Sequence, residues 1–384
     1  MRRILLLSGA IVLVDTVFFS ALTPLLPHYV HRLGLSKAGA GVLAGMYPAG
    51  VLVAGVPSGW VAARFGVKRS VLVGLTLLAA TTVAFGLANA EWSLDVARFA
   101  QGVSSAFSWT GSLAWLVAST PREHRGATIG SAFGAAIVGA LFGPVLGAAA
   151  SFVGTGAAFG AVAALALVLV AIALATPAAA PEEPQPLSML VGALRSRRLR
   201  LGFWFCLLPA LLFGTLSVLA PLRLSTLGWG AVAIGATYLV SAAFEAVWSP
   251  VIGRISDRRG RRVPLAGGLA ASAVAAALLP WPDAAWLLAA VVVAAGISFG
   301  TFWAPAMSLV TDAAEDLGLD YGYAFALVGL AWAPGQSGGA AIGGTVASLT
   351  RDAVPYLALA ALCAVTLVVT TRYGRTPVPV PAER

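Results

Sequence analysis

Twelve separate apolar runs follow one another along this chain, each about 20 residues long. This is the length that an α-helix needs to cross the hydrocarbon core of a bilayer. We therefore predict twelve membrane-spanning helices and an all-α membrane protein. The predicted spans lie near residues 4–26, 38–61, 70–90, 94–117, 127–150, 155–176, 199–222, 231–253, 263–281, 284–310, 323–347 and 353–372.

The composition excludes several classes of protein. Of the 384 residues, 59% are hydrophobic and 10% are charged, which is far below the roughly 25% charged residues of a soluble domain. Cys206 and Cys363 lie inside predicted spans, and His28, His31 and His124 form no cluster, so we expect no metal site. The sequence has no glycine-rich phosphate-binding loop, so we expect no ATP-driven transport. We also expect that the protein is not an enzyme and has no cofactor.

Basic residues concentrate on one side of the predicted spans. Cytoplasmic loops are enriched in Lys and Arg, so we predict a multi-pass protein of the plasma or inner membrane with both termini cytoplasmic. The net charge of +9 then reflects topology and not nucleic-acid binding. The side with more basic residues has Arg2, Arg3, Arg64, Lys68, Arg69, Arg122, Arg125, Arg195, Arg197, Arg198, Arg200, Arg254, Arg258, Arg259, Arg261, Arg262, Arg372, Arg375 and Arg384, and the other side has Arg32, Lys37, Arg223 and Arg351. The tenth connection disagrees with this pattern because it is acidic, with Asp312, Glu315, Asp316 and Asp320.

The two halves of the sequence resemble each other. A shift of 194 residues, the separation of Gly34 and Gly228, superposes Leu33-Gly34 on Leu227-Gly228, Gly41 on Gly235, Gly59 on Gly253, Arg64 on Arg258, Gly66 on Gly260 and Lys68 on Arg262. Such a repeat is typical of transporters built from two six-helix halves, with the substrate path between them. We predict one half at residues 1–176, a cytoplasmic linker at 177–198, and the other half with a short cytoplasmic tail at 199–384. The linker is predicted to be a tether, in which Leu187–Leu194 is a candidate interfacial helix.

The fifth predicted span carries a pattern of small residues. Glycine and proline are costly inside a helix, but a membrane helix with a face free of side chains can pack closely against another helix. The simplest interpretation is a close-packed helix pair. The pattern consists of Gly130, Gly139, Gly143-Pro144 and Gly147-Ala148. Its order and spacing resemble the fifth-helix antiporter motif of the major facilitator superfamily, which occurs in its exporters, with Ala148 where glycine is usual.

This resemblance implies the fold and the transport reaction. The expected fold is that of the major facilitator superfamily, with 12 transmembrane helices in two pseudo-symmetric six-helix halves. The expected reaction is the exchange of an exported solute for a proton, which needs no cofactor because the proton gradient supplies the energy. The expected partners are a small-molecule substrate, protons and the lipid bilayer, and the protein is expected to act as a monomer.

Two repeated loops resemble the superfamily's signature between its second and third helices. In the family, an aspartate of this loop pairs across the halves with a helix N-terminus and a nearby arginine, and holds the cytoplasmic side shut. Ala63 replaces the aspartate in the first copy, so the resemblance assigns this role to Asp257. Its expected partner is the start of the fifth helix, with Arg122 or Arg125; the alternative is that these loops only fix topology. The candidate gating residues are Gly59, Arg64, Gly66, Gly253, Asp257, Arg258 and Gly260.

Charged residues inside the predicted spans are candidates for function, because a charge at the centre of a bilayer costs about 2.5 to 3.5 kcal/mol. Asp15 and the following Pro24-Leu-Leu-Pro27 resemble the first helix of drug-efflux and vesicular amine transporters, whose aspartate contacts the cationic substrate. Arg98-Phe-Ala-Gln101-Gly102 resembles the fourth-helix motif of the same antiporters, whose arginine is proposed to take part in proton exchange. We predict that Asp15 is the protonation site and that Arg98 acts on it, since an arginine keeps its own proton. The alternative is a structural ion pair between the two.

Glu245 in the eighth span is a second candidate for proton or cation binding, with a structural carboxylate near the cytoplasmic end as the alternative. Polar residues of the fourth span recur at steps of three and four, so they share one helical face that must line water or protein. Aromatic residues within spans are candidates for stacking on flat or cationic solutes, and for each of them simple packing is the alternative. The candidate cavity residues are Phe18, Phe19, Gln101, Ser105, Trp109, Tyr238, Trp303, Trp332 and Gln336.

The function predicted from the sequence is proton-coupled efflux of small hydrophobic or cationic compounds by alternating access. Two alternatives stay open. One is an importer or facilitator of sugars or other metabolites on the same fold, and the other is a non-transporting membrane receptor on this fold. In the receptor, Asp15, Arg98 and Glu245 would be dispensable.

Overall fold

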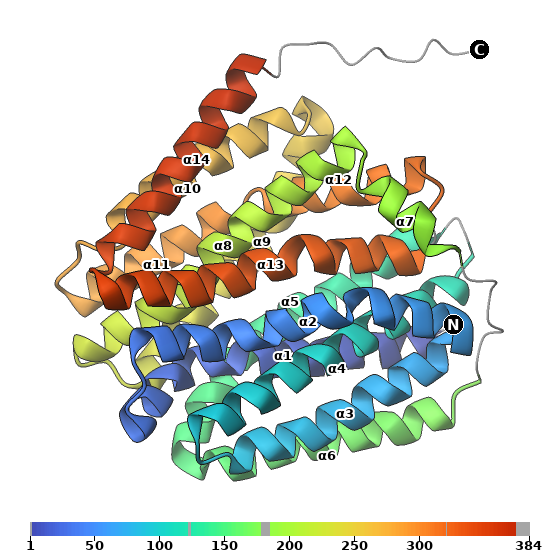
Figure 1. The fold of residues 1–384 in the computed structure, drawn as a ribbon, viewed down its shortest axis with the longest axis horizontal. Helices are drawn as coiled ribbons and strands as arrows, with labels where there is room; N and C mark the ends of the chain where they lie inside the picture. The colour runs from blue at the N-terminus through green and yellow to red at the C-terminus, as the bar shows by residue number, and fades with distance from the viewer. Residues whose placement is uncertain (1, 122–123, 178–184, 320, 374–384) are drawn as a thin grey trace.

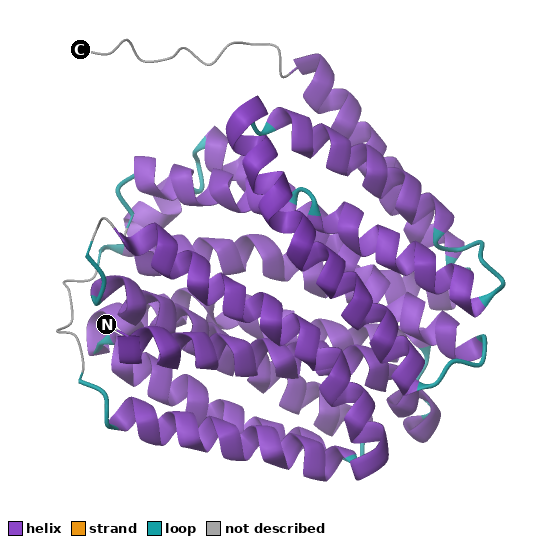
Figure 2. Cartoon of the chain, turned by 180° about the vertical axis from the view of Figure 1, so that it is seen from behind, coloured by secondary structure: helices purple, strands orange, loops and turns teal. Residues whose placement is uncertain are grey.

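The computed structural model describes residues 2–121, 124–177, 185–319 and 321–373. Within these ranges the chain forms helices joined by loops, and no strand is present (Figure 2). The helices are α1 (Arg2–Leu33), α2 (Lys37–Phe65), α3 (Val67–Leu87), α4 (Glu91–Ala118), α5 (Arg125–Val153), α6 (Thr155–Leu174), α7 (Leu187–Ala193), α8 (Arg197–Thr226), α9 (Ala231–Arg259), α10 (Arg262–Leu278), α11 (Ala285–Gly300), α12 (Trp303–Asp316), α13 (Tyr321–Leu349) and α14 (Ala353–Tyr373).

Each predicted span corresponds to a helix, except that the tenth consists of two. Helix α11 ends at Gly300 and α12 begins at Trp303, so this span is interrupted at Thr301 and Phe302. Among the described residues, nine helical stretches are long and apolar enough to cross a membrane, and α11 and α12 together count as one of them. Helices α4 and α13 fall outside this group, and α10 is slightly shorter.

The long helices form two bundles that repeat one packing pattern. In the first bundle, α1 packs on α5, α2 and α3 pack on α4, and α3 packs on α6. The second bundle has α8 on α13, α9 and α10 on α11, and α10 on α14. Figure 1 shows α1 to α6 (blue to green) below the second bundle, and the two meet mainly where α2 packs on α13 and α5 on α9. The fold predicted from the internal repeat is therefore confirmed.

Two pairs of glycines matched by the repeat form equivalent turns. Gly34 and Gly228 follow α1 and α8 with φ angles of 66° and 89°. Gly66 and Gly260 separate α2 from α3 and α9 from α10, with φ angles of 92° and 78°. Positive φ is accessible to glycine and costly for residues with a Cβ atom. The turn geometry therefore explains why glycine occurs at both copies of each position.

Helix α5 packs on α1 through three glycines of its motif. A Cβ atom added at Gly139 or Gly143 would lie 2.7 or 2.8 Å from a backbone oxygen of α1, and one at Gly147 would lie 2.6 Å from the Pro24 ring. A larger residue at these positions would push the two helices apart. Gly130 has no such neighbour and lies on an exposed part of α5.

The other face of the motif contacts the second half. A Cβ atom at Gly235 of α9 would lie 2.9 Å from the Pro144 backbone oxygen and 3.3 Å from the Ala148 methyl group. The methyl group of Ala148 fits because glycine stands opposite it. The departure from the usual glycine at this position is therefore compatible with close packing of α5 on α9.

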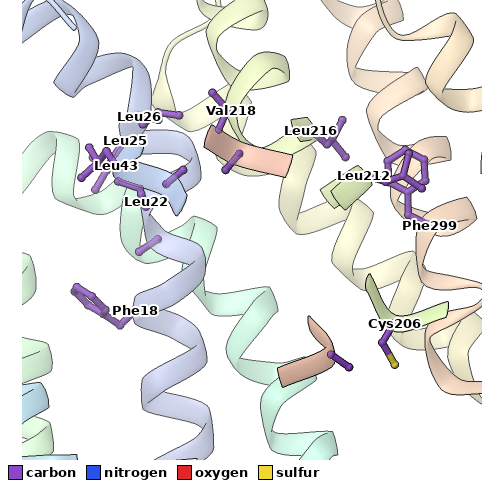
Figure 3. Packing of buried hydrophobic residues seen from close by; sticks show 14 of the residues in the cluster. Phe18, Leu22, Leu25, Leu26, Leu43, Cys206, Leu212, Leu216, Val218 and Phe299 are labelled. Carbon is purple, nitrogen blue, oxygen red and sulfur yellow. The ribbon is translucent and has the colours of Figure 1, made fainter. Parts of the chain in front are cut away.

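Most buried apolar residues form one large cluster that runs through both halves, and two small clusters lie around Tyr47 and Leu113. Figure 3 shows Leu25 and Leu26 of α1 near Leu43 of α2, and shows Leu212 of α8 near Phe299 of α11. This continuous packing fixes the helices whose other faces line the interior of the bundle.

We call the end of the bundle that carries the α1–α2, α8–α9 and α13–α14 connections the distal end, and the end with the amino terminus the proximal end (Figure 1). At the distal end, Lys37 at the start of α2 forms a 2.5 Å ion pair with Asp352 before α14. Gly41 of α2 also lies directly against the backbone of Ala340 and Gly344 on α13. The two halves are therefore in close contact at the distal end.

The acidic tenth connection is neutralised by neighbouring arginines at the proximal end. Arg261 after α9 pairs with Asp312 at 2.6 Å, and Arg198 at the start of α8 pairs with Asp312 and Asp316. This pairing accounts for the one loop that broke the charge pattern; its Asp320 lies outside the described residues. The linker contains the short helix α7, as the sequence suggested.

Candidate functional site: a cavity between the halves

A cavity of about 280 Å³ lies between the two halves. Helices α1, α2, α4 and α5 of the first half and α8, α9, α12 and α13 of the second half contribute to its wall. The wall combines apolar and aromatic side chains with a smaller number of polar and charged ones. Its aromatic and polar residues are Phe19, Ser20, Thr23, Arg98, Phe213, Ser217, Tyr238, Ser241, Glu245, Trp303, Trp332 and Gln336.

Asp15 is buried inside the first half, with 2% of its surface exposed, and does not line the cavity. The Tyr47 hydroxyl, the Ser105 hydroxyl and the Trp109 indole N–H all donate hydrogen bonds to its Oδ2 atom, at 2.7, 2.8 and 2.7 Å. The other carboxylate oxygen, Oδ1, is buried and has no hydrogen-bond partner among the described residues. Since Oδ2 already accepts three hydrogen bonds, Oδ1 is the position at which a proton can be added.

Arg98 of α4 is buried among aromatic rings, with 1% of its surface exposed. Its guanidinium carbon lies 4.8 Å from the centre of the Tyr47 ring and 5.4, 5.6 and 6.0 Å from the Phe18, Phe19 and Phe85 rings. Its Nη2 atom donates to the Phe19 backbone oxygen at 2.8 Å. Cation–π contacts and this hydrogen bond stabilise the buried charge in place of an ion pair.

Tyr47 connects the two charged groups of the first half. Among the described residues, Asp15 and Arg98 do not form an ion pair. The Tyr47 hydroxyl binds Asp15 while the face of its ring contacts the Arg98 guanidinium. The direct structural ion pair considered from the sequence is therefore replaced by an indirect link through a tyrosine.

Glu245 of α9 lines the cavity from the second half. Its carboxyl group lies beside Gly300, where an added Cβ atom would be 2.8 Å from the carboxyl carbon, so the absent side chain makes room for it. Within the described part of the chain, the Glu245 side chain has no ion pair or hydrogen bond. It is thus an acidic group at the cavity wall without a polar protein partner.

The interruption between α11 and α12 is held against the same face of α9. The Trp248 indole N–H donates to the Thr301 hydroxyl at 3.0 Å, one turn from Glu245. The next helix, α12, begins with Trp303, which lines the cavity. The break therefore places Glu245 and an aromatic ring on the same stretch of the wall.

The structure separates the sequence-derived candidates into two groups. Those that line the cavity are Arg98, Glu245, Phe19, Tyr238, Trp303, Trp332 and Gln336. Those that lie away from it are Asp15, Phe18, Gln101, Ser105 and Trp109. Ser105 and Trp109 instead bind Asp15, while Phe18 packs edge-on against Phe85 and Phe159.

Gln101 belongs to the interior of the first half. Its side-chain amide donates to the Thr81 backbone oxygen of α3 at 3.2 Å, and it has 0% exposure. The neighbouring Ser104 donates to the Gly74 backbone oxygen at 2.8 Å. This part of the polar face of α4 therefore faces protein, one of the two outcomes that the helical spacing allowed.

Two residues of the candidate site were missed from the sequence, one beside Asp15 and one in the cavity wall. Tyr47 precedes Pro48 in an apolar span, and only its contact with Asp15 distinguishes it from an ordinary packing residue. Phe213 lines the cavity and contacts Phe299 edge-on, and no sequence pattern sets it apart from the other aromatics.

The candidate gating loops lie at the proximal end. Arg64 and Arg258 are exposed, and the nearby Lys68 donates to the two backbone oxygens of Leu174 and Thr176 that end α6. Arg122 and the side chains of Asp257 and Arg125 lie outside the described residues, so the gating role of this loop stays a prediction. Gly59 and Gly253 lie within α2 and α9.

Residues 8–336 match the family model of the Major Facilitator Superfamily. The chain belongs to the Major Facilitator Superfamily. Over 266 residues it is 29% identical to the uncharacterized MFS-type transporter YcaD of Escherichia coli O7:K1, and the alignment covers 68% of each protein. The chain is therefore a membrane transporter of this superfamily and not an enzyme.

Solved structures of other superfamily members share the fold. The xylose transporter XylE from E. coli, in a partially occluded inward-open conformation, matches with a TM-score of 0.78 at 12% identity, covering 100% of this chain and 98% of XylE. A bacterial homologue of the human lysosomal transporter Spinster, inward-facing and unoccupied, matches with a TM-score of 0.75 at 17% identity, covering 95% and 93%. At these identities the likeness shows the fold alone.

Proposed function

We propose that this superfamily member is a proton-coupled exporter of small hydrophobic or cationic compounds. The two halves alternate between opening at the distal end, which faces the outside, and opening at the proximal end, which faces the cytoplasm. The solute occupies the cavity between the halves. The observation that carries the proposal is Glu245, an acidic side chain with no ion pair or hydrogen bond among the described residues, in the wall of a cavity between the halves that also contains aromatic rings.

The cavity wall suits a cationic or aromatic solute. An organic cation gains from contact with a carboxylate and from the faces of aromatic rings within about 6 Å. Glu245, Trp303 and Trp332 supply these groups. The cation Arg98 is also present, but aromatic rings and the Phe19 backbone oxygen already hold its guanidinium group.

In the proposed exchange, Asp15 binds the proton. It is separate from the cavity, so the solute and the proton need not occupy the same space. The free Oδ1 atom accepts the proton, while the three donors to Oδ2 hold the side chain in place in either protonation state. Ionisable residues inside a membrane bundle are typical of proton relays.

The proton gradient is sufficient for export. One proton moving down a membrane potential of 100 mV releases about 2.3 kcal/mol. This free energy supports a solute gradient of roughly 50-fold before any pH difference is counted.

The experiment uses purified protein in proteoliposomes with an imposed pH gradient and a pH-sensitive dye inside. A panel of lipophilic cations and neutral aromatic drugs is added to wild type, Asp15→Asn and Glu245→Gln. We expect substrate-triggered proton movement in the wild type and its loss in Asp15→Asn. Glu245→Gln should weaken the binding of cations by about tenfold and that of neutral compounds much less.

Asp283→Asn is the matched control, because this aspartate is 93% exposed and pairs only with Arg223 at the distal end. It should behave as the wild type. Uphill export with an unchanged pH dependence in correctly inserted Asp15→Asn would exclude Asp15 as the proton site. Solute accumulation by right-side-out cells without proton exchange would instead support an importer or facilitator.

A further inference from the structure

Tyr47 lies between the buried carboxylate and the cavity wall. Its hydroxyl group donates to Asp15, and its ring is 4.9 Å from the Phe19 ring. Phe19 in turn contacts Trp332 of the second half edge-on, at 5.6 Å. Phe19 and Trp332 both line the cavity, whereas Tyr47 and Asp15 do not. The chain of contacts thus runs from the cavity, across the interface of the halves, to Asp15.

A second set of contacts follows the same course. Of the four rings around Arg98, that of Tyr47 is the nearest, at 4.8 Å. Arg98 lines the cavity and also binds the Phe19 backbone oxygen. Both the aromatic and the cationic part of the wall therefore reach Asp15 through Tyr47.

The other donors to Asp15 have no ring contact with Phe19 or Trp332 among the described residues. Ser105 has only a hydroxyl group, which lies beside Tyr47, and the Trp109 ring lies 6.0 Å from the Phe133 ring of α5, tilted by 56°. All three residues donate a hydrogen bond to Asp15 Oδ2, but they differ in the other residues that they contact.

The charged and titratable groups around Asp15 are few. Helix α2 contributes Tyr47 and α4 contributes Arg98, while Glu245 and Tyr238 reach the cavity from α9. Helices α5 and α6, which also pack on α1, have no charged or titratable side chain between residues 128 and 174. Tyr47 is therefore the titratable side chain that contacts both the carboxylate and the cavity wall.

We propose that Tyr47 is the positioning residue that couples occupancy of the cavity to protonation of Asp15. The inference rests on the proposed proton-coupled export. A solute packed against Phe19 and Trp332 holds the Tyr47 ring in place, so its hydroxyl stays on Oδ2 and favours the ionised carboxylate. The O–H bond at Oδ1 then breaks, and the proton leaves to water. By linkage, protonation of Asp15 loosens the same contact and weakens solute binding by the same factor.

The test compares Tyr47→Phe with Ser105→Ala in detergent-solubilised protein. Each variant removes one donor to the same oxygen. Tyr47→Phe keeps the ring contacts with Phe19 and Arg98 and removes the hydroxyl bond that joins them to Asp15. The probe is tetraphenylphosphonium. Its binding is followed by quenching of tryptophan fluorescence between pH 5 and 9, and proton release on binding is followed by a dye in weak buffer.

For the wild type we expect proton release on binding and weaker binding at low pH. Ser105→Ala should still release protons, over a shifted pH range. Tyr47→Phe should bind the probe at high pH within about threefold of the wild type, and the ratio of its affinities at high and low pH should fall by about tenfold. Phe19→Leu is the second variant, because it weakens the ring contact and leaves the hydroxyl group in place; it should show the same loss of pH dependence.

Two results would overturn the inference in distinguishable ways. Normal proton release and an unchanged pH dependence in Tyr47→Phe, together with release in the wild type, would refute the role of Tyr47 and leave the proposed exchange intact. Binding without proton release in the wild type would refute the exchange itself, and the role of Tyr47 with it.

Discussion

The closed distal end depends on glycines that allow α2 and α13 to touch, and this makes a sharp prediction for Gly344→Ala. A Cβ atom at Gly344 would lie 3.0 Å from the Gly41 Cα atom and closer still to the Lys37 backbone oxygen. These neighbours are backbone atoms, so the helices must separate to admit the methyl group. Overpacking of this kind costs about 1 to 3 kcal/mol.

The cost applies only to the conformation in which the distal ends touch. If the halves separate there during transport, the substitution raises the free energy of the closed state and leaves the open state unchanged. The ratio of closed to open protein should then fall by about 5- to 150-fold. The local clash in Gly344→Ala therefore increases the fraction of protein in the open state.

The assay is double electron–electron resonance with spin labels at Trp92 and Trp286. These residues lie near the distal starts of α4 and α11 and are 71% and 68% exposed. Gly338→Ala on α13 is the matched control, because the nearest atom to its added Cβ would be the Leu211 Cδ2 atom at 3.8 Å, an ordinary contact. Gly344→Ala should shift the population to longer distances, and Gly338→Ala should not. Identical distance distributions in the two variants would refute the reasoning.

Three further predictions follow from single contacts. Ala148→Val should separate α5 from α9, because its methyl group already lies 3.3 Å from the Cβ position of Gly235, and the same spin labels should report distal opening. Lys68→Met should lower the free energy of unfolding by about 1 to 2 kcal/mol in thermal melts, since two backbone oxygens at the end of α6 lose their donor. Lys37→Met should change the closed-to-open ratio by at most about fivefold, because its pair with Asp352 is partly exposed, and a double-mutant cycle measures that coupling.

The fold could be predicted from the sequence because membrane spans and internal repeats leave direct traces in it. The lengths of the apolar runs set the helices, and the two loop glycines Gly66 and Gly260 marked equivalent turns that have positive φ in both copies. The interruption of the tenth span was not predicted. The sequence does carry a signal for it, because Pro305 lies four residues after Thr301 and its ring clashes with the carbonyl group at that position in a continuous helix. The contact of Thr301 with Trp248 holds the break against α9.

The charged residues of the candidate site could be predicted from the sequence, but the contacts between its side chains could not. A charge inside a span is rare and costly, so Asp15, Arg98 and Glu245 stood out. An aromatic residue in an apolar span does not stand out, which is why Tyr47 was missed and Phe18 was assigned to the cavity. Phe18 packs in the core against Phe85 of α3 and Phe159 of α6, whereas the next residue, Phe19, lines the cavity. Helical spacing alone does not show which side of α1 faces the core and which faces the cavity.

The polar residues of α4 make two kinds of contact, one with α3 and the other with α1 and α2. Toward α3, small residues such as Gly74 bring the backbones close enough for Ser104 to bond to a backbone oxygen, which makes the first half rigid at that contact. Toward α1 and α2, Ser105 donates to Asp15, and Arg98 contacts the Tyr47 ring and donates to the Phe19 backbone oxygen. The Ser105 bond depends on the protonation state of its acceptor, the Asp15 carboxylate, whereas the acceptor of the Ser104 bond is a backbone oxygen that does not titrate. A change in Asp15 protonation would therefore alter the contacts toward the cavity while the contact of α4 with α3 keeps the half intact, which is what movement of the halves as rigid bodies requires.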